Sequence, residues 1–246
     1  MLARAVTHAL VGLEPRKVEV EAHLQPGVPG FAIVGLADRA CQEAKHRVRS
    51  GVVSASLEWP LNRRITVNLA PAALRKEGSG FDLPISLALL AATRQLPPER
   101  LAEHAAVGEL ALDGRIRPVS GTLAVAEGAR GAGLRRVVCA AESAPEAALA
   151  GIEPVPVRHL AEVVAYFRGE IEAPPYEPLS DDDLEAPRRP IWRTFEVRNE
   201  HAGPSRSRPR ARTTCCLQDR PAPGRPCLRG ASRGFFRLLR ARKPSR

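Results

Sequence analysis

The sequence has few aromatic side chains and no long apolar run. Aromatic residues make up 4% of the 246 residues, so a folded core must be built mainly from aliphatic side chains. No apolar run reaches the roughly 18 residues that a membrane-spanning helix needs. The first residues also lack the apolar stretch of a signal peptide. These absences favour a cytoplasmic protein without a membrane partner.

Cysteine and histidine are too few and too scattered to form a disulfide framework or a metal site. The five cysteines are an odd number, and the adjacent pair Cys215 and Cys216 does not match the C-x-x-C spacing of zinc ligands. The six histidines share no metal-ligand spacing with one another or with a cysteine. We therefore expect no bound metal.

Charge divides the chain into two unlike parts. Residues 1–189 hold 22 Lys or Arg and 24 Asp or Glu, a net charge of −2, whereas residues 190–246 hold 15 and 3, a net charge of +12. We therefore predict a folded domain over 1–170, a linker rich in Pro and Asp over 171–189, and a basic tail over 190–246. The tail is rich in Arg and Pro and poor in β-branched residues, so we expect it to be disordered.

The first 170 residues alternate between strand and helix patterns. Period-2 patterns and short apolar runs predict strands over residues 18–24, 31–36, 65–69 and 136–139, and the run 31–36 favours a buried strand. Residues 152–157 lead to the last helix. Helical spacing predicts helices over residues 37–54, 85–94, 121–132 and 160–167. Asp113-Gly114 predicts a hairpin within 106–119, and Ser143 and Glu146 have the spacing of a capping box. We expect an α/β domain, a mixed sheet with helices packed on it.

The loop Lys76-Glu-Gly-Ser-Gly80 allows two interpretations. Lys76 and Ser79 could form a Ser–Lys nucleophile pair. Alternatively, the glycines permit a tight turn from a strand into a helix. The spacing by itself favours the turn.

Several motifs resemble a known family. The segments in question are 28–38 (VPGFAIVGLAD), 65–71 (ITVNLAP), 76–85 (KEGSGFDLPI) and 107–121 (VGELALDGRIRPVSG). The last two are similar to the proteolytic domain of Lon-type proteases. Together they resemble the N-terminal, Lon-protease-like domain of magnesium-chelatase-like AAA+ ATPases of the ComM/YifB type. The resemblance covers about residues 2–170.

The resemblance to Lon does not extend to its nucleophile and its lysine. With Lys76 and Gly78 placed on the Lon motif Lys-Asp-Gly-Pro-Ser-Ala-Gly, Gly80 takes the serine position and Ser79 lies one residue early. Leu123 stands where Lon has its lysine, and no lysine occurs between Lys76 and Lys243. A Ser–Lys dyad needs a desolvated lysine beside the hydroxyl. We therefore expect a non-proteolytic domain without catalytic residues, with a Lon-like serine peptidase using Ser79 and Lys76 as the alternative.

The family resemblance implies an ATPase domain after the linker, but the phosphate-loop pattern G-x-x-x-x-G-K-[ST] is absent. Shifted by one base, codons permitted for residues 190–198 encode PDLADVRGQ. Those permitted for residues 218–228 likewise encode GPPGTGKTML. Both strings match the start and the phosphate loop of that ATPase domain. We interpret residues 190–246 as an out-of-frame remnant of it.

The function expected from the resemblance is that of a hexameric, ATP-driven motor that processes DNA, with branch migration during natural transformation as the family role. ATP and Mg²⁺ are the cofactors of the full-length family. This chain has no in-frame phosphate loop, so we expect no cofactor in it and no ATPase activity. A further alternative is that the basic tail binds nucleic acid non-specifically and in a salt-sensitive way.

Overall fold

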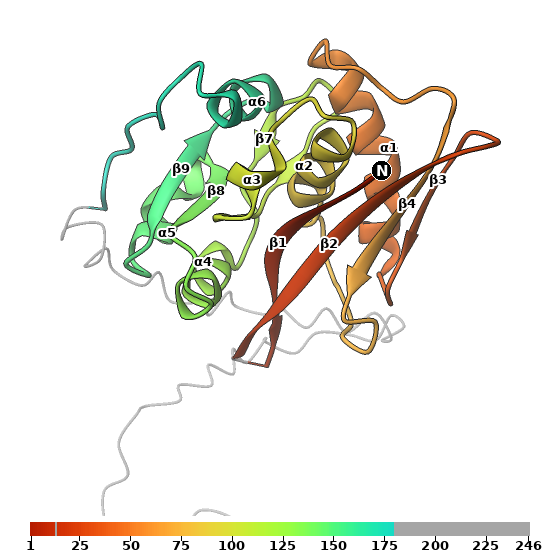
Figure 1. Ribbon diagram of the computed structural model, residues 1–246. Helices are drawn as coiled ribbons and strands as arrows, with labels where there is room; N and C mark the ends of the chain where they lie inside the picture. Colours follow the sequence, from red (N-terminus) through yellow and green to blue (C-terminus); the bar gives the residue numbers. More distant parts are fainter. Residues whose placement is uncertain (13, 180–246) are drawn as a thin grey trace, which may run out of the picture. The chain divides into compact units, whose positions relative to one another are not determined.

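The computed structural model describes residues 1–12 and 14–179, which form a mixed sheet with helices packed on it (Figure 1). The predicted tail over 190–246, its disorder and its out-of-frame origin lie outside these residues, as does the linker beyond residue 179. The strands of the main sheet are β1 (Leu2–Val11), β2 (Glu14–Pro26), β3 (Gly30–Val34), β4 (Arg63–Ala70), β5 (His104–Ala106), β8 (Arg136–Ala140) and β9 (Glu153–Val157). The helices are α1 (Arg39–Ser54), α2 (Asp82–Ala92), α3 (Pro98–Leu101), α4 (Thr122–Gly131), α5 (Ala144–Ala148) and α6 (Leu160–Arg168). The predicted α/β fold class is confirmed.

The strand order is β3-β4-β2-β1-β5-β8-β9, and four of the six neighbouring pairs are parallel. The antiparallel pairs are β1 with β2 and β2 with β4. A separate short hairpin, β6 (Glu109–Leu110) with β7 (Ile116–Arg117), forms around the predicted Asp113-Gly114 turn. Gly114 has a φ of +90°, a conformation that glycine adopts without steric cost.

Alternate residues of β8 show that helices cover both faces of the sheet. Val138 and Ala140 belong to the main core, together with the apolar faces of α1, α2 and α6. Val137 and Cys139 point the other way, into a smaller core with α4 and α5. Every residue of α2 is buried, as expected for a helix that is apolar on all sides.

Helix α1 shows how local sequence determines an element here. Its buried face is Cys41, Ala44, Val48 and Val52, the helical spacing seen in the sequence. Asp38 caps its first turn, because its Oδ1 accepts a hydrogen bond from the amide of Cys41 at 2.7 Å. The helix therefore has a defined start as well as a defined buried face.

Two local predictions are wrong. The run 31–36 is not a buried strand: β3 lies at the edge of the sheet, and Val34 and Leu36 are 45% and 58% exposed. Ser143 does not form a capping box, since its backbone is helical (φ −96°, ψ −5°) within a continuous turn and its side chain makes no capping hydrogen bond. Glu146 instead accepts a hydrogen bond from the amide of Leu123 at 3.0 Å, and so caps the neighbouring helix α4.

Strand β1 was not predicted from the sequence. Its buried side chains include Ala3, Ala5 and Thr7, which are small and give a weak period-2 signal. The strand nevertheless occupies the middle of the sheet, where it pairs with β2 over its whole length and with β5 at Val6. It forms one wall of the groove described next.

Candidate functional site

A groove of about 800 Å³ lies between the second half of β1, the glycine-rich loop and the segment that follows the hairpin. Its lining consists of residues 7–11, 73–75, 77–81, 107, 109, 118–121 and 125. The walls are largely apolar, and the polar groups include Ser79, Glu109 and Ser120. We call it the Ser79 groove. Of the two residues predicted for the peptidase alternative, Ser79 lines it and Lys76 does not.

The glycine-rich loop is fixed in place by backbone contacts. The amide of Gly78, whose φ is +87°, donates to Oδ2 of Asp38 at 3.1 Å, the same carboxylate that caps α1. The carbonyl of Gly80 accepts from the amide of Gly108 at 3.1 Å. These contacts join the loop to α1 on one side and to the segment between β5 and β6 on the other.

Lys76 is fully buried away from the Ser79 groove. Its Nζ donates to the carbonyl oxygen of Gly35 at 2.9 Å and to that of Pro71. Burial lowers the pKa of the Lys76 ammonium. Gly35 has to be glycine, because its φ is +107° and a Cβ there would lie 2.3 Å from the carbonyl oxygen of Leu69. Lys76 thus links the end of β3 to the segment after β4 and has no hydrogen bond to Ser79.

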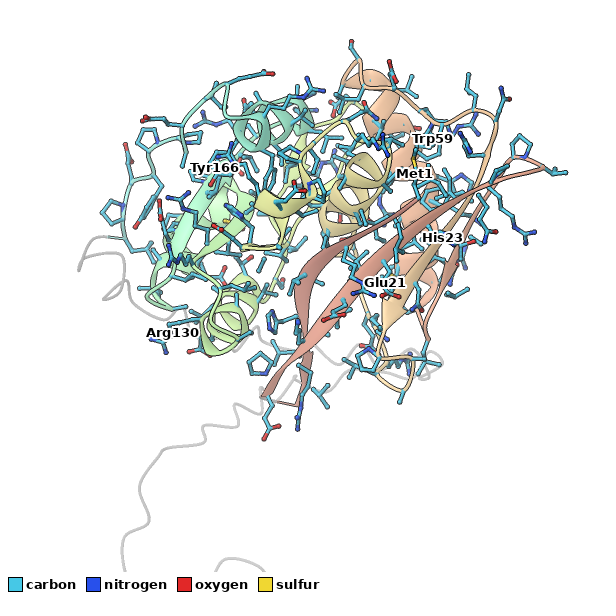
Figure 2. All side chains as sticks on the ribbon, viewed as in Figure 1. Met1, Glu21, His23, Trp59, Arg130 and Tyr166 are labelled. Atoms are coloured by element: carbon cyan, nitrogen blue, oxygen red, sulfur yellow. The ribbon has the colours of Figure 1, made fainter. Side chains whose placement is uncertain are left out.

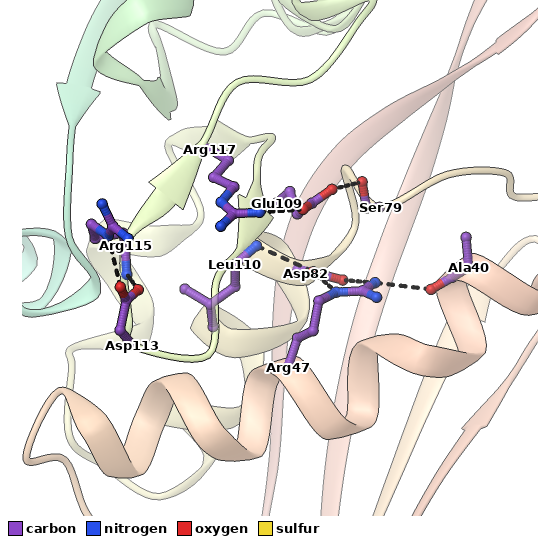
Figure 3. A network of polar contacts seen from close by, with 9 residues as sticks. All are labelled: Ala40, Arg47, Ser79, Asp82, Glu109, Leu110, Asp113, Arg115 and Arg117. Atoms are coloured by element: carbon purple, nitrogen blue, oxygen red, sulfur yellow. Dashed lines mark hydrogen bonds and ion pairs between the residues drawn. The ribbon is translucent and has the colours of Figure 1, made fainter.

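Ser79 is held by a carboxylate instead of an amine (Figure 3). Its Oγ donates to Oε2 of Glu109, and Oε1 of that glutamate lies 3.8 Å from Nη1 of Arg117. A serine nucleophile needs a base that removes its proton, and in a Ser–Lys dyad that base is a neutral lysine amine. Leu123, at the position of the Lon lysine, packs instead against the smaller core. The groove therefore presents a hydroxyl without the base that a Lon-type reaction needs.

A buried ion pair lies beside this serine in Figure 3. Asp82, at the start of α2, accepts from Nε and Nη2 of Arg47 at 2.5 and 3.0 Å and from the amide of Leu110 at 3.2 Å. Burial raises the pKa of the Asp82 carboxyl and the guanidinium opposes that shift, while the hydrogen bond to Asp82 raises the pKa of Arg47. The pair joins α1, α2 and the hairpin, and so fixes the position of strand β6, which carries Glu109.

His8 of β1 also lines the groove. It is 5% exposed, and its Nδ1 has no hydrogen-bond partner in the described part of the chain. Burial, with a smaller effect of Lys17, lowers its pKa to about 4. It packs on α4 where Gly128 leaves room, since a Cβ there would lie 2.5 Å from the ring. His8 is therefore a neutral, buried side chain at neutral pH.

The site residues that the sequence did not reveal are Glu109, His8 and the Arg47–Asp82 pair. Arg47 and Asp82 are 35 positions apart, so no local spacing pattern joins them. In the sequence, nothing distinguishes Glu109 from the other residues of the hairpin motif. His8 lies on the strand that the sequence did not predict.

The described residues do not fit the ATP or Mg²⁺ implied by the family resemblance. The only lysine of the glycine-rich loop is bound to backbone carbonyls, whereas a phosphate loop needs a lysine free to reach the β- and γ-phosphates. Within residues 1–12 and 14–179, no group of three or more His, Cys, Asp or Glu side chains could hold a metal ion. No helix in that part of the chain has the length and apolar character to cross a membrane.

Comparisons with known proteins agree on one family. A family model described as subunit ChlI of Mg-chelatase matches residues 20–143. The uncharacterized protein YifB of Escherichia coli K12 is 41% identical over 165 residues, which are 67% of this chain and 32% of YifB. Competence protein ComM of Haemophilus influenzae is 39% identical over 174 residues, 70% of this chain and 34% of ComM. Lon protease 3 of Sorangium cellulosum is 26% identical over 155 residues, 58% of this chain and 18% of that protease. The chain spans about a third of the length of its YifB and ComM relatives.

Proposed function

Because the chain belongs to the Mg-chelatase ChlI family, with YifB and ComM as relatives, we propose that its folded residues act as a non-proteolytic domain of an ATP-driven protein that processes DNA. ATP hydrolysis and force generation belong to the part of such proteins that follows this domain. The folded domain then serves assembly or regulation, in a hexamer when the ATPase part is present. This chain by itself is neither a peptidase nor an ATPase.

The observation that carries the proposal is the separation of the two groups that a Ser–Lys dyad would need together. The ammonium of Lys76 donates hydrogen bonds to the carbonyls of Gly35 and Pro71. The hydroxyl of Ser79 donates one to the carboxylate of Glu109. Activating Ser79 as in a Ser–Lys dyad would require a neutral amine at the groove, and Leu123 occupies the place where Lon has one. The fold of a Lon-like domain is kept, while no lysine is among the residues that line its groove.

Hydrolysis of an unfolded protein tests the absence of peptidase activity. Purified full chain is incubated with fluorescently labelled casein, alongside the Ser79→Ala variant and the Ser120→Ala variant as a matched serine of the same groove. We expect all three to release label at the same background rate. Casein hydrolysis by the parent that Ser79→Ala abolishes and Ser120→Ala keeps would refute the proposal.

Nucleotide titration tests the second half of the proposal. The sequence lacks the phosphate-loop pattern, whose backbone amides and lysine hold the β- and γ-phosphates. We expect calorimetry with Mg²⁺ and ATP to show no saturable heat. Mg²⁺-dependent binding with a micromolar dissociation constant would contradict it.

A further inference from the structure

A second groove, of about 310 Å³, lies at the β3 edge of the sheet and combines aromatic and cationic side chains. We call it the Trp59 groove. Its lining consists of Pro29, Gly30, Phe31, Lys45, His46, Arg49, Trp59, Pro60, Leu61, Arg63 and Ile65. It shares no residue with the Ser79 groove. No carboxylate is among its lining residues, which sets it apart from the rest of a nearly neutral domain.

The aromatic part of the groove is a pair of partly exposed rings. Phe31 and Trp59 have ring centroids 5.7 Å apart and planes tilted by 48°. The guanidinium carbon of Arg49 lies 6.0 Å from the centroid of the Trp59 ring. A flat π-face with a cation beside it is the arrangement on which nucleobases stack.

The cationic part of the groove consists of Lys45, Arg49 and Arg63. Lys45 and Arg49 lie one turn apart on α1, and Arg63 begins β4 beside them. Among the described residues, none of these three side chains forms a salt bridge. Nine of the 17 arginines among the described residues do so: Arg4, Arg16, Arg39, Arg47, Arg75, Arg115, Arg117, Arg136 and Arg168. Three cations without a salt bridge to any described residue, placed around an aromatic pair, are complementary to an anion that carries aromatic rings.

We propose that the Trp59 groove binds single-stranded nucleic acid, with a base stacked on Trp59 and Phe31 and the adjoining phosphates on Lys45, Arg49 and Arg63. We expect a single strand because the faces of its bases are free to stack on aromatic rings. In a duplex these faces are already stacked on neighbouring bases. Arg49 moves from the ring to a phosphate when the base arrives. The inference goes beyond the proposed function and does not depend on it, since the groove uses neither Ser79 nor any nucleotide-hydrolysing residue.

Fluorescence of Trp59 reports binding at this groove even though the basic tail also attracts nucleic acid. The chain has two tryptophans, so Trp192→Phe leaves Trp59 as the only one. The full chain with this substitution is titrated with oligothymidylate of about eight nucleotides, within the usual site size of about 4–16 nucleotides. We expect saturable quenching of Trp59 emission that weakens as salt is raised. Binding seen by a labelled oligonucleotide without any change in Trp59 emission would place the strand on the tail and overturn the proposal.

Charge reversal provides the matched comparison. Arg49→Glu with Arg63→Glu, made in the Trp192→Phe chain, should weaken the quenching titration by about tenfold or more and reduce the salt slope by about 1.4, or 0.7 per lost contact. Arg130→Glu with Arg135→Glu changes the net charge equally at exposed positions; Arg130 lies across the molecule from Trp59 (Figure 2). We expect this control to leave the titration within about twofold. Equal weakening by both variants would show a general charge effect and refute the groove as the site.

Two ligand controls complete the test. A duplex of the same length should quench Trp59 at least about tenfold less effectively at equal concentration, because its bases are not free to stack. A mononucleotide should bind more weakly still, because it offers one phosphate to three cations. Equal quenching by the duplex or by the mononucleotide would contradict a single-strand site.

Discussion

Replacing Lys76 tests whether the buried ammonium is a structural group. Lys76→Met keeps the apolar stem but removes the donor. The carbonyl oxygen of Gly35 then loses its partner, whereas that of Pro71 keeps a hydrogen bond from the amide of Leu74 at 3.2 Å. One unsatisfied buried acceptor costs about 1–3 kcal/mol, which is the loss expected in the free energy of unfolding. The cost of burying the ammonium disappears in the variant, which moves the expected loss toward the lower half of that range.

The assay for this prediction is urea unfolding followed by circular dichroism at pH 7. With a slope of about 1–3 kcal/mol per molar urea, a loss of about 1.5 kcal/mol moves the midpoint down by at least about 0.5 M. Lys17→Met is the matched control, because Lys17 has an exposed side chain and should change stability by less than about 0.5 kcal/mol. A Lys76→Met midpoint equal to that of Lys17→Met would refute the structural role.

Three further predictions concern the groove and its supports. The pKa of His8 is lowered from 6.5 to about 4, so the unfolded chain takes up its proton first, and stability should fall by about 2–3 kcal/mol between pH 6.5 and pH 4; urea midpoints across this range should fall less steeply in His8→Gln. Asp82→Asn should destabilise by about 2–4 kcal/mol because Arg47 then lacks its counter-ion, and adding Arg47→Met should restore part of the loss in a double-mutant cycle. Glu146→Ala should cost about 0.5–2 kcal/mol by leaving the amide of Leu123 uncapped, measured as a lower thermal midpoint.

Each of these predictions has an outcome that contradicts it. An unchanged pH profile in His8→Gln would mean that another group carries the acid sensitivity. Additive losses in the Asp82 and Arg47 cycle would show that the two side chains are not coupled. A Glu146→Gln variant as destabilised as Glu146→Ala would show that the oxygen acceptor is not what matters, since the amide side chain keeps one.

Elements whose signal is local were predicted from the sequence. The buried face of α1 follows from the spacing of Cys41, Ala44, Val48 and Val52, and Asp113-Gly114 marks the turn of the short hairpin. Both depend on periodicity or turn chemistry within a few residues. This is why the α/β class and the order of most elements could be predicted from the sequence.

Features that depend on distant parts of the chain could not be predicted in this way. β1 is buried through small residues, because its neighbours on both sides and not its own hydrophobicity hold it in the sheet. Ser143 and Glu146 have the spacing of a capping box, yet Glu146 caps α4. That helix lies next to Glu146 only in the folded domain. Ser79 was identified as a candidate, but its partner Glu109 is 30 positions away and could be found only from the fold.

The central claim is that Ser79 is not a nucleophile, and covalent labelling tests it most directly. The full chain is incubated with a fluorophosphonate, and the modified residue is located by mass spectrometry, with Ser79→Ala and Glu109→Gln in parallel. The hydrogen-bonded hydroxyl without an amine base predicts no phosphonylation of Ser79 above the level of Ser120. Stoichiometric modification of Ser79 that is lost in Ser79→Ala would contradict the account.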